Sequence, residues 1–201
     1  MINYFIKGSQ FDIYFLFSLL FSTISLSLFF IIKEDKREKI FKLILFFLLI
    51  FYFLYSSFLL IIQYYVWKNS PFSKYLLPPY LPITYFLSYS LFMFFRDFFF
   101  RIIGLFLIIL IANLIIFILK RDPFYEDEKP IIYLCSMLLS FPYNFFFIFL
   151  SFFILLLMGI LSWKIKEYIS FRNFWLILIN LLLILEPFVF SNFTFLIQIK
   201  P

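Results

Sequence analysis

The chain has 201 residues, of which 65% are hydrophobic, 27% are aromatic and only 14% are charged, and its formal net charge is +6. A soluble domain is typically about half apolar and a quarter charged, so this composition excludes a fold with an ordinary water-facing surface. The basic balance does not indicate nucleic acid, because Lys and Arg in short loops orient membrane proteins and contact anionic headgroups.

The residue inventory also limits the chemistry. The chain has no histidine and one cysteine, Cys135, which lies in an apolar run. One thiol cannot form an intramolecular disulfide, and no Cys/His set is present for zinc, haem or an iron–sulfur cluster. Histidine is the commonest general base, and no phosphate-binding, metallohydrolase or nucleophile-elbow motif occurs either. We therefore expect no cofactor and no metal site.

The first part of the chain predicts two membrane helices. Residues 13–32 and 43–67 are uncharged apolar runs, and about 20 such residues cross the ~30 Å hydrocarbon core. The first run is long and lacks the small-residue cleavage site of a signal peptide, so we expect a retained span. Residues 33–42 between the runs are rich in Lys and Arg. Residues 68–82 contain several prolines, which lack a backbone N–H, and predict an irregular loop at the aqueous edge.

Residues 83–119 form an apolar stretch that is too long for one perpendicular span. At 1.5 Å per residue, a helix over this stretch would be about 55 Å long. We therefore expect a membrane helix over 98–119, preceded by an interfacial or short helix over 83–96. In an alternative threading, residues 83–95 cross the membrane as a short span of their own.

The remaining apolar segments predict a broken hairpin and a last span. Residues 131–141 and 143–163 are separated by Pro142, which bends or breaks a helix. The first leg is short for a full crossing and fits a tilted or re-entrant half-helix, which is tolerated only where protein or a wet cavity covers it. Residues 173–195 predict the last span.

The distribution of basic residues ranks the threadings. Placing residues 33–42, 120–130 and 164–172 in the cytoplasm puts most of the 17 Lys and Arg residues inside, and requires 131–163 to enter and return. A plain five-span threading, with one crossing for 131–163, agrees less well with this rule. We expect one all-α transmembrane domain over residues 1–201 with about five or six membrane helices. It would lie in the cell (plasma) membrane, with an organellar inner membrane as the alternative.

The segment "FFRDFFFR" (94–101) keeps charged residues in an apolar setting. Counted from Leu119, Arg101 lies about 27 Å along the helix, near the outer boundary, where an arginine can extend its head to the headgroups. Asp97 and Arg101 are spaced i,i+4 and could pair on one helix face. This arrangement predicts an interface anchor made of Arg96, Asp97 and Arg101.

A sharper hypothesis involves Glu186, which precedes Pro187 in the last span. A charged side chain at the membrane centre costs ~2.5–3.5 kcal/mol on insertion scales, so Glu186 must be protonated, paired or facing water. We expect Arg96 or Arg101 to pair with Glu186 around a small outward-facing polar pocket. Asn144, in the bend at Pro142, would lie on the same side and complete the pocket.

Other polar residues predict packing rather than chemistry. Asn113 and Asn180 are amides inside spans, where we expect hydrogen bonds to other helices. Ser18, Ser22 and Ser25 share one face of the first span and predict close helix approach. The adjacent carboxylates at 126–128 could suggest a metal site, but acidic residues in a loop are usually solvated, and no second acidic motif accompanies them.

Three function classes are compatible with these observations. A non-enzymatic accessory or assembly subunit fits the lack of catalytic apparatus, and its partners would be the lipid bilayer and another membrane protein. A transporter or channel component would need a water-accessible polar path. A membrane-embedded enzyme acting on a lipid-linked substrate would have to use the few carboxylates of the chain. We expect the first class, and no role in nucleic-acid binding.

Overall fold

The computed structural model describes residues 2–120, 122, 124–140, 143–165 and 172–197, and every regular element within these ranges is helical. The elements are, in chain order, α1 (Ile2–Ile31), α2 (Glu34–Asn69), the 3-10 helix η1 (Ser73–Leu76), α3 (Ile83–Leu119), α4 (Glu128–Leu138), α5 (Tyr143–Ile165) and α6 (Arg172–Ile197). The all-helical class predicted from the sequence is therefore confirmed.

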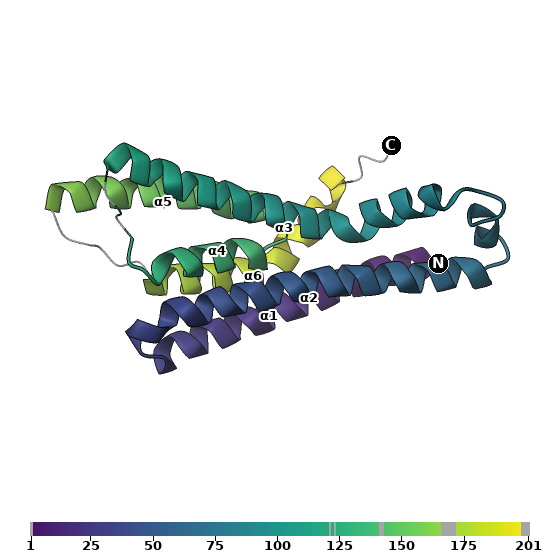
Figure 1. Cartoon of the computed structure of the whole chain (residues 1–201), viewed down its shortest axis with the longest axis horizontal. Helices are drawn as coiled ribbons and strands as arrows, with labels where there is room; N and C mark the ends of the chain where they lie inside the picture. The colour runs from purple at the N-terminus through teal and green to yellow at the C-terminus, as the bar shows by residue number, and fades with distance from the viewer. Residues whose placement is uncertain (1, 121, 123, 141–142, 166–171, 198–201) are drawn as a thin grey trace.

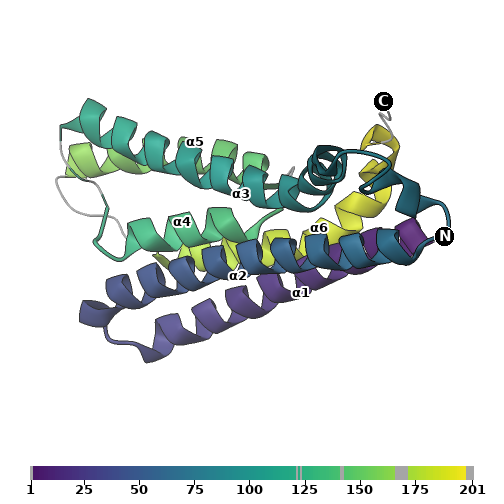
Figure 2. The same ribbon diagram turned by 45° about the vertical axis from the view of Figure 1, so that its right-hand side comes forward.

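The helices stack in three layers. α1 and α2 form an antiparallel pair on one side, α3 and α5 lie on the other side, and α4 and α6 run between them (Figure 1, Figure 2). The turn between α1 and α2 and the start of α4 lie at one end of the molecule. We call it the basic end, because the Lys- and Arg-rich segment 33–42 lies there. The connection between α2 and α3 lies at the opposite end, near the N-terminus. The main hydrophobic core fills the space between the layers.

Among the described residues, three helices are long and apolar enough to cross a membrane. They comprise Tyr14–Ile31 in α1, Lys36–Asn69 in α2 and the whole of α3, while Tyr143–Leu157 and Asn173–Leu185 are shorter apolar stretches. The outward faces carry large apolar side chains, such as Phe117, which is 82% exposed. In water such a surface would associate, whereas a bilayer covers it. Helix length, composition and surface thus agree with a membrane protein.

α2 begins at Glu34, so nearly the whole basic segment 33–42 belongs to its first turns. The segment contains no proline or glycine to stop a helix. Glu38 and Lys42 form an i,i+4 ion pair on its exposed side, an arrangement that supports a helix locally. The connection between α1 and α2 therefore consists of Ile32 and Lys33 alone.

α3 is one unbroken helix, whereas the sequence predicts a separate element over 83–96. No proline occurs within it, and nothing in its sequence removes a backbone hydrogen bond where the break was expected. The helix starts after Pro82, whose backbone is extended, and ends at Lys120, whose φ of 55° places it in the left-handed region. A left-handed residue is a common way to end a helix.

α4 and α5 form the broken hairpin. α4 has 11 residues and is about 16 Å long, roughly half of a ~30 Å hydrocarbon core. It starts at the basic end and stops in the middle of the bundle, and α5 runs back to the same end (Figure 1). Leu139, with an extended backbone, marks the break, while Pro142 lies outside the described residues. α4 corresponds to the half-helix expected over 131–141, shifted toward the N-terminus.

Candidate functional site

Arg101 of α3 lies at the centre of the bundle, where it is 2% exposed. Its Nη1 donates hydrogen bonds to the carbonyl oxygens of Met137 (2.6 Å) and Leu138 (2.7 Å) and to the Tyr52 hydroxyl (3.2 Å). The guanidinium carbon is 4.5 Å from the centroid of the Tyr52 ring, a favourable cation–π distance. Arg101 thus joins α2, α3 and the end of α4.

The two carbonyls bound by Arg101 belong to the last residues of α4. The last four carbonyls of a helix have no partner within it, and their partial charges sum to roughly −0.5 at the C-terminus. In water such groups are solvated, but inside a bilayer an unsatisfied carbonyl costs several kcal/mol. Arg101 supplies both the missing donors and a compensating positive charge, which gives a buried cation a structural reason to be there.

Hydroxyl groups from α1 and α2 extend this arrangement. The Ser18 and Tyr52 hydroxyls are 2.7 Å apart, and so are the Tyr14 and Ser56 hydroxyls. Tyr52 therefore links α1 to Arg101, and through Arg101 to α4. Polar groups that satisfy each other in a low-dielectric interior rigidify the packing around them. We call Ser18, Tyr52 and Arg101, with the carbonyls of Met137 and Leu138, the arginine network.

A close contact between α3 and α5 lies next to this network. The buried Asn144 donates a hydrogen bond from Nδ2 to the Phe100 carbonyl oxygen at 3.1 Å. A Cβ atom on Gly104 would overlap the Asn144 carboxamide. Glycine is therefore required at position 104, because only its missing side chain lets the first turn of α5 seat against α3.

The other end of α4 carries buried carboxylates. Glu128, its first residue, is 0% exposed and accepts hydrogen bonds from the Trp175 indole (3.3 Å) and the Tyr125 amide (3.4 Å). Asp127 lies 4.0 Å from Nη1 of Arg37. The expectation that the acidic loop 126–128 is solvated is wrong for Asp127 and Glu128, because carboxylates at a helix N-terminus are stabilised by its partial positive charge.

α4 thus has an acid at its N-terminus and an arginine at its C-terminus, both buried and both complementary to the helix dipole. Apart from Lys129 and Tyr133, its residues are buried. Among the described residues, no group of three or more His, Cys, Asp or Glu side chains is placed to hold a metal ion. The arrangement is suited to fixing a half-helix inside the bundle, and Arg101 and Glu128 are closed off from external solutes.

The predicted anchor of Arg96, Asp97 and Arg101 is divided between two sides of α3. Asp97 Oδ1 is 3.6 Å from Arg96 Nε, and within the described part of the chain the expected Asp97–Arg101 ion pair does not form. Arg101 points inward, so its predicted extension to the headgroups is wrong. Residues five apart on an α-helix point about 140° from each other, which is why one arginine faces the core and the other faces outward.

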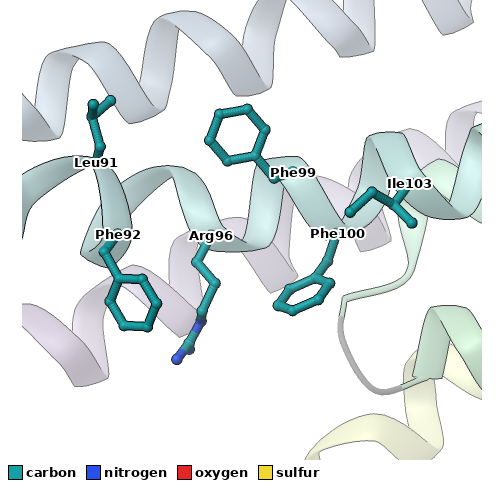
Figure 3. Close-up of a pocket in the computed structure, with 6 residues that line it drawn as sticks. All are labelled: Leu91, Phe92, Arg96, Phe99, Phe100 and Ile103. Atoms are coloured by element: carbon teal, nitrogen blue, oxygen red, sulfur yellow. The ribbon is translucent and has the colours of Figure 1, made fainter. Parts of the chain in front are cut away.

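Arg96 lies in a groove of ≈ 330 Å³ on the outward face of α3. Figure 3 shows Phe92, Arg96 and Phe100 extending from the same side of the helix, with the guanidinium between the two rings. Leu91, Phe99 and Ile103 complete the lining. Arg96 is half-exposed, and its neighbours in the groove are apolar.

The other predicted residues have different outcomes. The Glu186 side chain lies outside the described residues, so its pairing with an arginine stays a prediction. Asn113 is exposed, and Asn180 donates to the carbonyl of Leu176 in its own helix at 2.7 Å, so neither makes the expected interhelical hydrogen bond within the described part. Ser18, Ser22 and Ser25 are all buried, as a packing face requires.

Sequence reasoning missed Tyr52, Gly104 and Glu128 as members of the site. Gly104 gave a signal, because a lone glycine within a long apolar helix often marks a close approach of another element. For Tyr52 there was no such signal, because nothing in the sequence distinguishes it within the 14 tyrosines of the chain. Glu128 was hidden by its acidic neighbours, since nothing local indicates that one of three adjacent carboxylates opens a buried helix.

No protein-family model, curated protein or solved structure matches this chain. Functional inference therefore depends on the geometry of the site and on the surface of the bundle.

Proposed function

We propose that the protein is a non-enzymatic integral membrane protein that acts as an accessory or assembly subunit of another membrane component. The observation that supports this proposal is the use made of the buried polar groups. The arginine network and Glu128 bind the chain's own backbone and side chains, and they fix α4 inside the bundle. These buried polar groups thus rigidify the interior, and the functional contacts would be made by the outer surface.

The surface suits this role. Large apolar side chains on the long helices, among them Phe46 of α2 and Phe106 of α3, are 59% and 64% exposed. Membrane helices associate through van der Waals packing, without the hydrophobic driving force that acts in water, so such faces can contact either lipid or a partner helix. A catalytic or transport site would instead need polar groups that an external solute can reach, and Arg101 at 2% exposure is enclosed.

Photo-crosslinking in the native membrane tests the accessory role. A photoreactive residue is placed at Phe46 or Phe106, and a third at the buried Ile108 serves as the matched control. We expect one exposed position to capture a specific membrane protein, which then co-purifies in mild detergent at a fixed ratio. The accessory role would be contradicted if no exposed position captured another protein and the chain ran as a single monomeric species in mild detergent.

We further propose that the basic end faces the cytoplasm, in the plasma membrane of a cell or the inner membrane of an organelle. Lys36 and Lys74 are both exposed and belong to opposite ends of the molecule. A membrane-impermeant thiol reagent should label Lys74→Cys in intact cells and Lys36→Cys only after lysis. Cys135, at 0% exposure, gives no background. Labelling of both positions from one side would refute this threading.

A transporter or channel component is the second candidate function. It is favoured by two buried groups beside the end of α4, Arg101 Nε and Asn144 Oδ1, that have no hydrogen-bond partner among the described residues. A half-helix terminus inside a bundle is a common setting for ion and substrate sites. Purified protein in liposomes tests this: anion flux that disappears in Arg101→Lys would favour transport, and absence of flux would favour the accessory role.

A further inference from the structure

We propose that the groove around Arg96 binds an anionic phospholipid, with the lipid phosphate on the guanidinium and an acyl chain along the apolar lining. The groove is made by Leu91, Phe92, Arg96, Phe99, Phe100 and Ile103 (Figure 3). It faces away from the arginine network and does not depend on the proposed accessory role. Three features of the structure carry the inference, namely the size of the groove, the state of Arg96 and its level along α3.

The size of the groove suits a hydrocarbon chain. Its residues extend over 13 positions of α3, from Leu91 to Ile103, or about 18 Å, and a helix of about 10 Å diameter fills roughly 1,400 Å³ over that length. The groove measures ≈ 330 Å³, near the lower limit of small-ligand sites. A slender hydrocarbon chain can enter it, whereas a partner helix could insert only single side chains.

The guanidinium of Arg96 is available to a ligand. Within the described part of the chain its nearest acid is Asp97, whose Oδ1 is 3.6 Å from Nε, beyond hydrogen-bond distance. Both terminal nitrogens are thus left for a bidentate contact, and arginine matches phosphate in this geometry. Asp97 lowers the local positive charge, so it weakens the predicted lipid contact without blocking it.

The level of Arg96 fits a headgroup. Counted from Leu119 at the basic end, Arg96 is 23 residues, or about 35 Å, along α3. At the average membrane-helix tilt of about 20° this becomes roughly 32 Å, close to the ~30 Å thickness of the hydrocarbon core. Arg96 then meets the phosphates of the opposite leaflet, while Phe99, Phe100 and Ile103 lie toward the membrane interior, where an acyl chain belongs.

Native mass spectrometry of the delipidated, full-length protein tests the proposal. The protein is titrated with phosphatidylglycerol or with phosphatidylcholine, and the dissociation constant of the first bound lipid is measured. We expect phosphatidylglycerol to bind more tightly, because the choline cation of phosphatidylcholine offsets the charge of its phosphate. Arg96→Gln should weaken phosphatidylglycerol about five- to tenfold and phosphatidylcholine by less. Lys74→Gln, which removes a positive charge from the exposed loop of the same end, is the matched control and should leave both constants unchanged.

A second pair of variants tests the apolar part of the groove. Ile103→Trp fills the groove from an exposed position and should weaken both lipids, whereas Phe106→Trp, one turn further along and outside the lining, should not. Asp97→Asn should strengthen phosphatidylglycerol binding. The proposal is overturned if Arg96→Gln binds phosphatidylglycerol like the wild type, if the headgroup makes no difference, or if Ile103→Trp has no effect. Capture of a protein instead of a lipid by a photoreactive residue at Phe99 would also overturn it.

Discussion

Replacing Arg101 with leucine is the most direct test of the arginine network. The substitution keeps an apolar side chain in the core but removes the donors to Met137 O and Leu138 O. The last turn of α4 would then hold two buried carbonyls without partners. Arg101→Lys keeps the charge, but its single ammonium cannot reproduce the planar set of donors.

The magnitude follows from the groups left behind. A buried acceptor that loses its donor costs about 1–3 kcal/mol, so two carbonyls cost about 2–6 kcal/mol. Removing a buried cation offsets part of this loss, because its desolvation is no longer required. We therefore expect a net destabilisation of about 1–3 kcal/mol for Arg101→Leu. For a chain of this size, where 1 kcal/mol shifts Tm by about 2–4 °C, this corresponds to roughly 4–8 °C at the centre of that range.

Thermal unfolding in detergent, followed by tryptophan fluorescence, to which the buried Trp175 contributes, measures the effect. Arg96→Leu is the matched control, because it makes the same chemical change in the same helix at a half-exposed position. We expect it to lower the free energy of unfolding by less than about 1 kcal/mol, and Arg101→Lys to be intermediate. The reasoning fails if Arg101→Leu melts at or above the wild-type temperature, or if Arg96→Leu loses as much.

Two further predictions concern the contacts around α4 and α5. Gly104→Ala places a methyl group against the Asn144 carboxamide and should lower the free energy of unfolding by about 1–3 kcal/mol. Adding Asn144→Ala to the same chain should recover part of this loss. Strictly additive losses in the double variant would argue against the contact. Trp175→Phe removes a donor from the buried Glu128 and should lower the free energy of unfolding by about 1–3 kcal/mol. The control Trp67→Phe, which loses packing alone, should lower it by less. Equal losses would mean that the indole hydrogen bond contributes nothing.

The general architecture could be predicted from the sequence because apolar runs have a fixed relation to membrane thickness. Residues 13–31 of the first predicted run lie within α1, residues 43–67 lie within α2, and the short helix α4 precedes the position of the expected break. The exact ends of the helices could not be predicted as well. The charged segment 33–42 continues a helix instead of interrupting it, because charges on an exposed helix face cost little and can pair within the turn.

The direction in which Arg101 points could not be derived from the sequence. Arg96 and Arg101 have similar neighbours, and helical spacing shows only that they face different sides, not which side is the core. That choice is made by α4, whose last carbonyls, without partners in their own helix, lie on one side of α3. Because α4 is distant in sequence from Arg101, and the need for a donor arises only once the hairpin is folded, no local pattern reveals it.

The few buried charges of this chain can be explained by one feature, the interruption of a helix inside an apolar bundle. A continuous helix satisfies its own backbone, whereas the two ends of α4 leave amides and carbonyls that have no partner within the helix, in the interior of the bundle. An acid is needed at the first end and a cation at the second, and Glu128 and Arg101 provide them. Arg96 has no such task, since it binds no helix end and lies outside the core. Its half-exposed side chain instead lines an apolar groove, and the proposed lipid phosphate gives this arrangement a function.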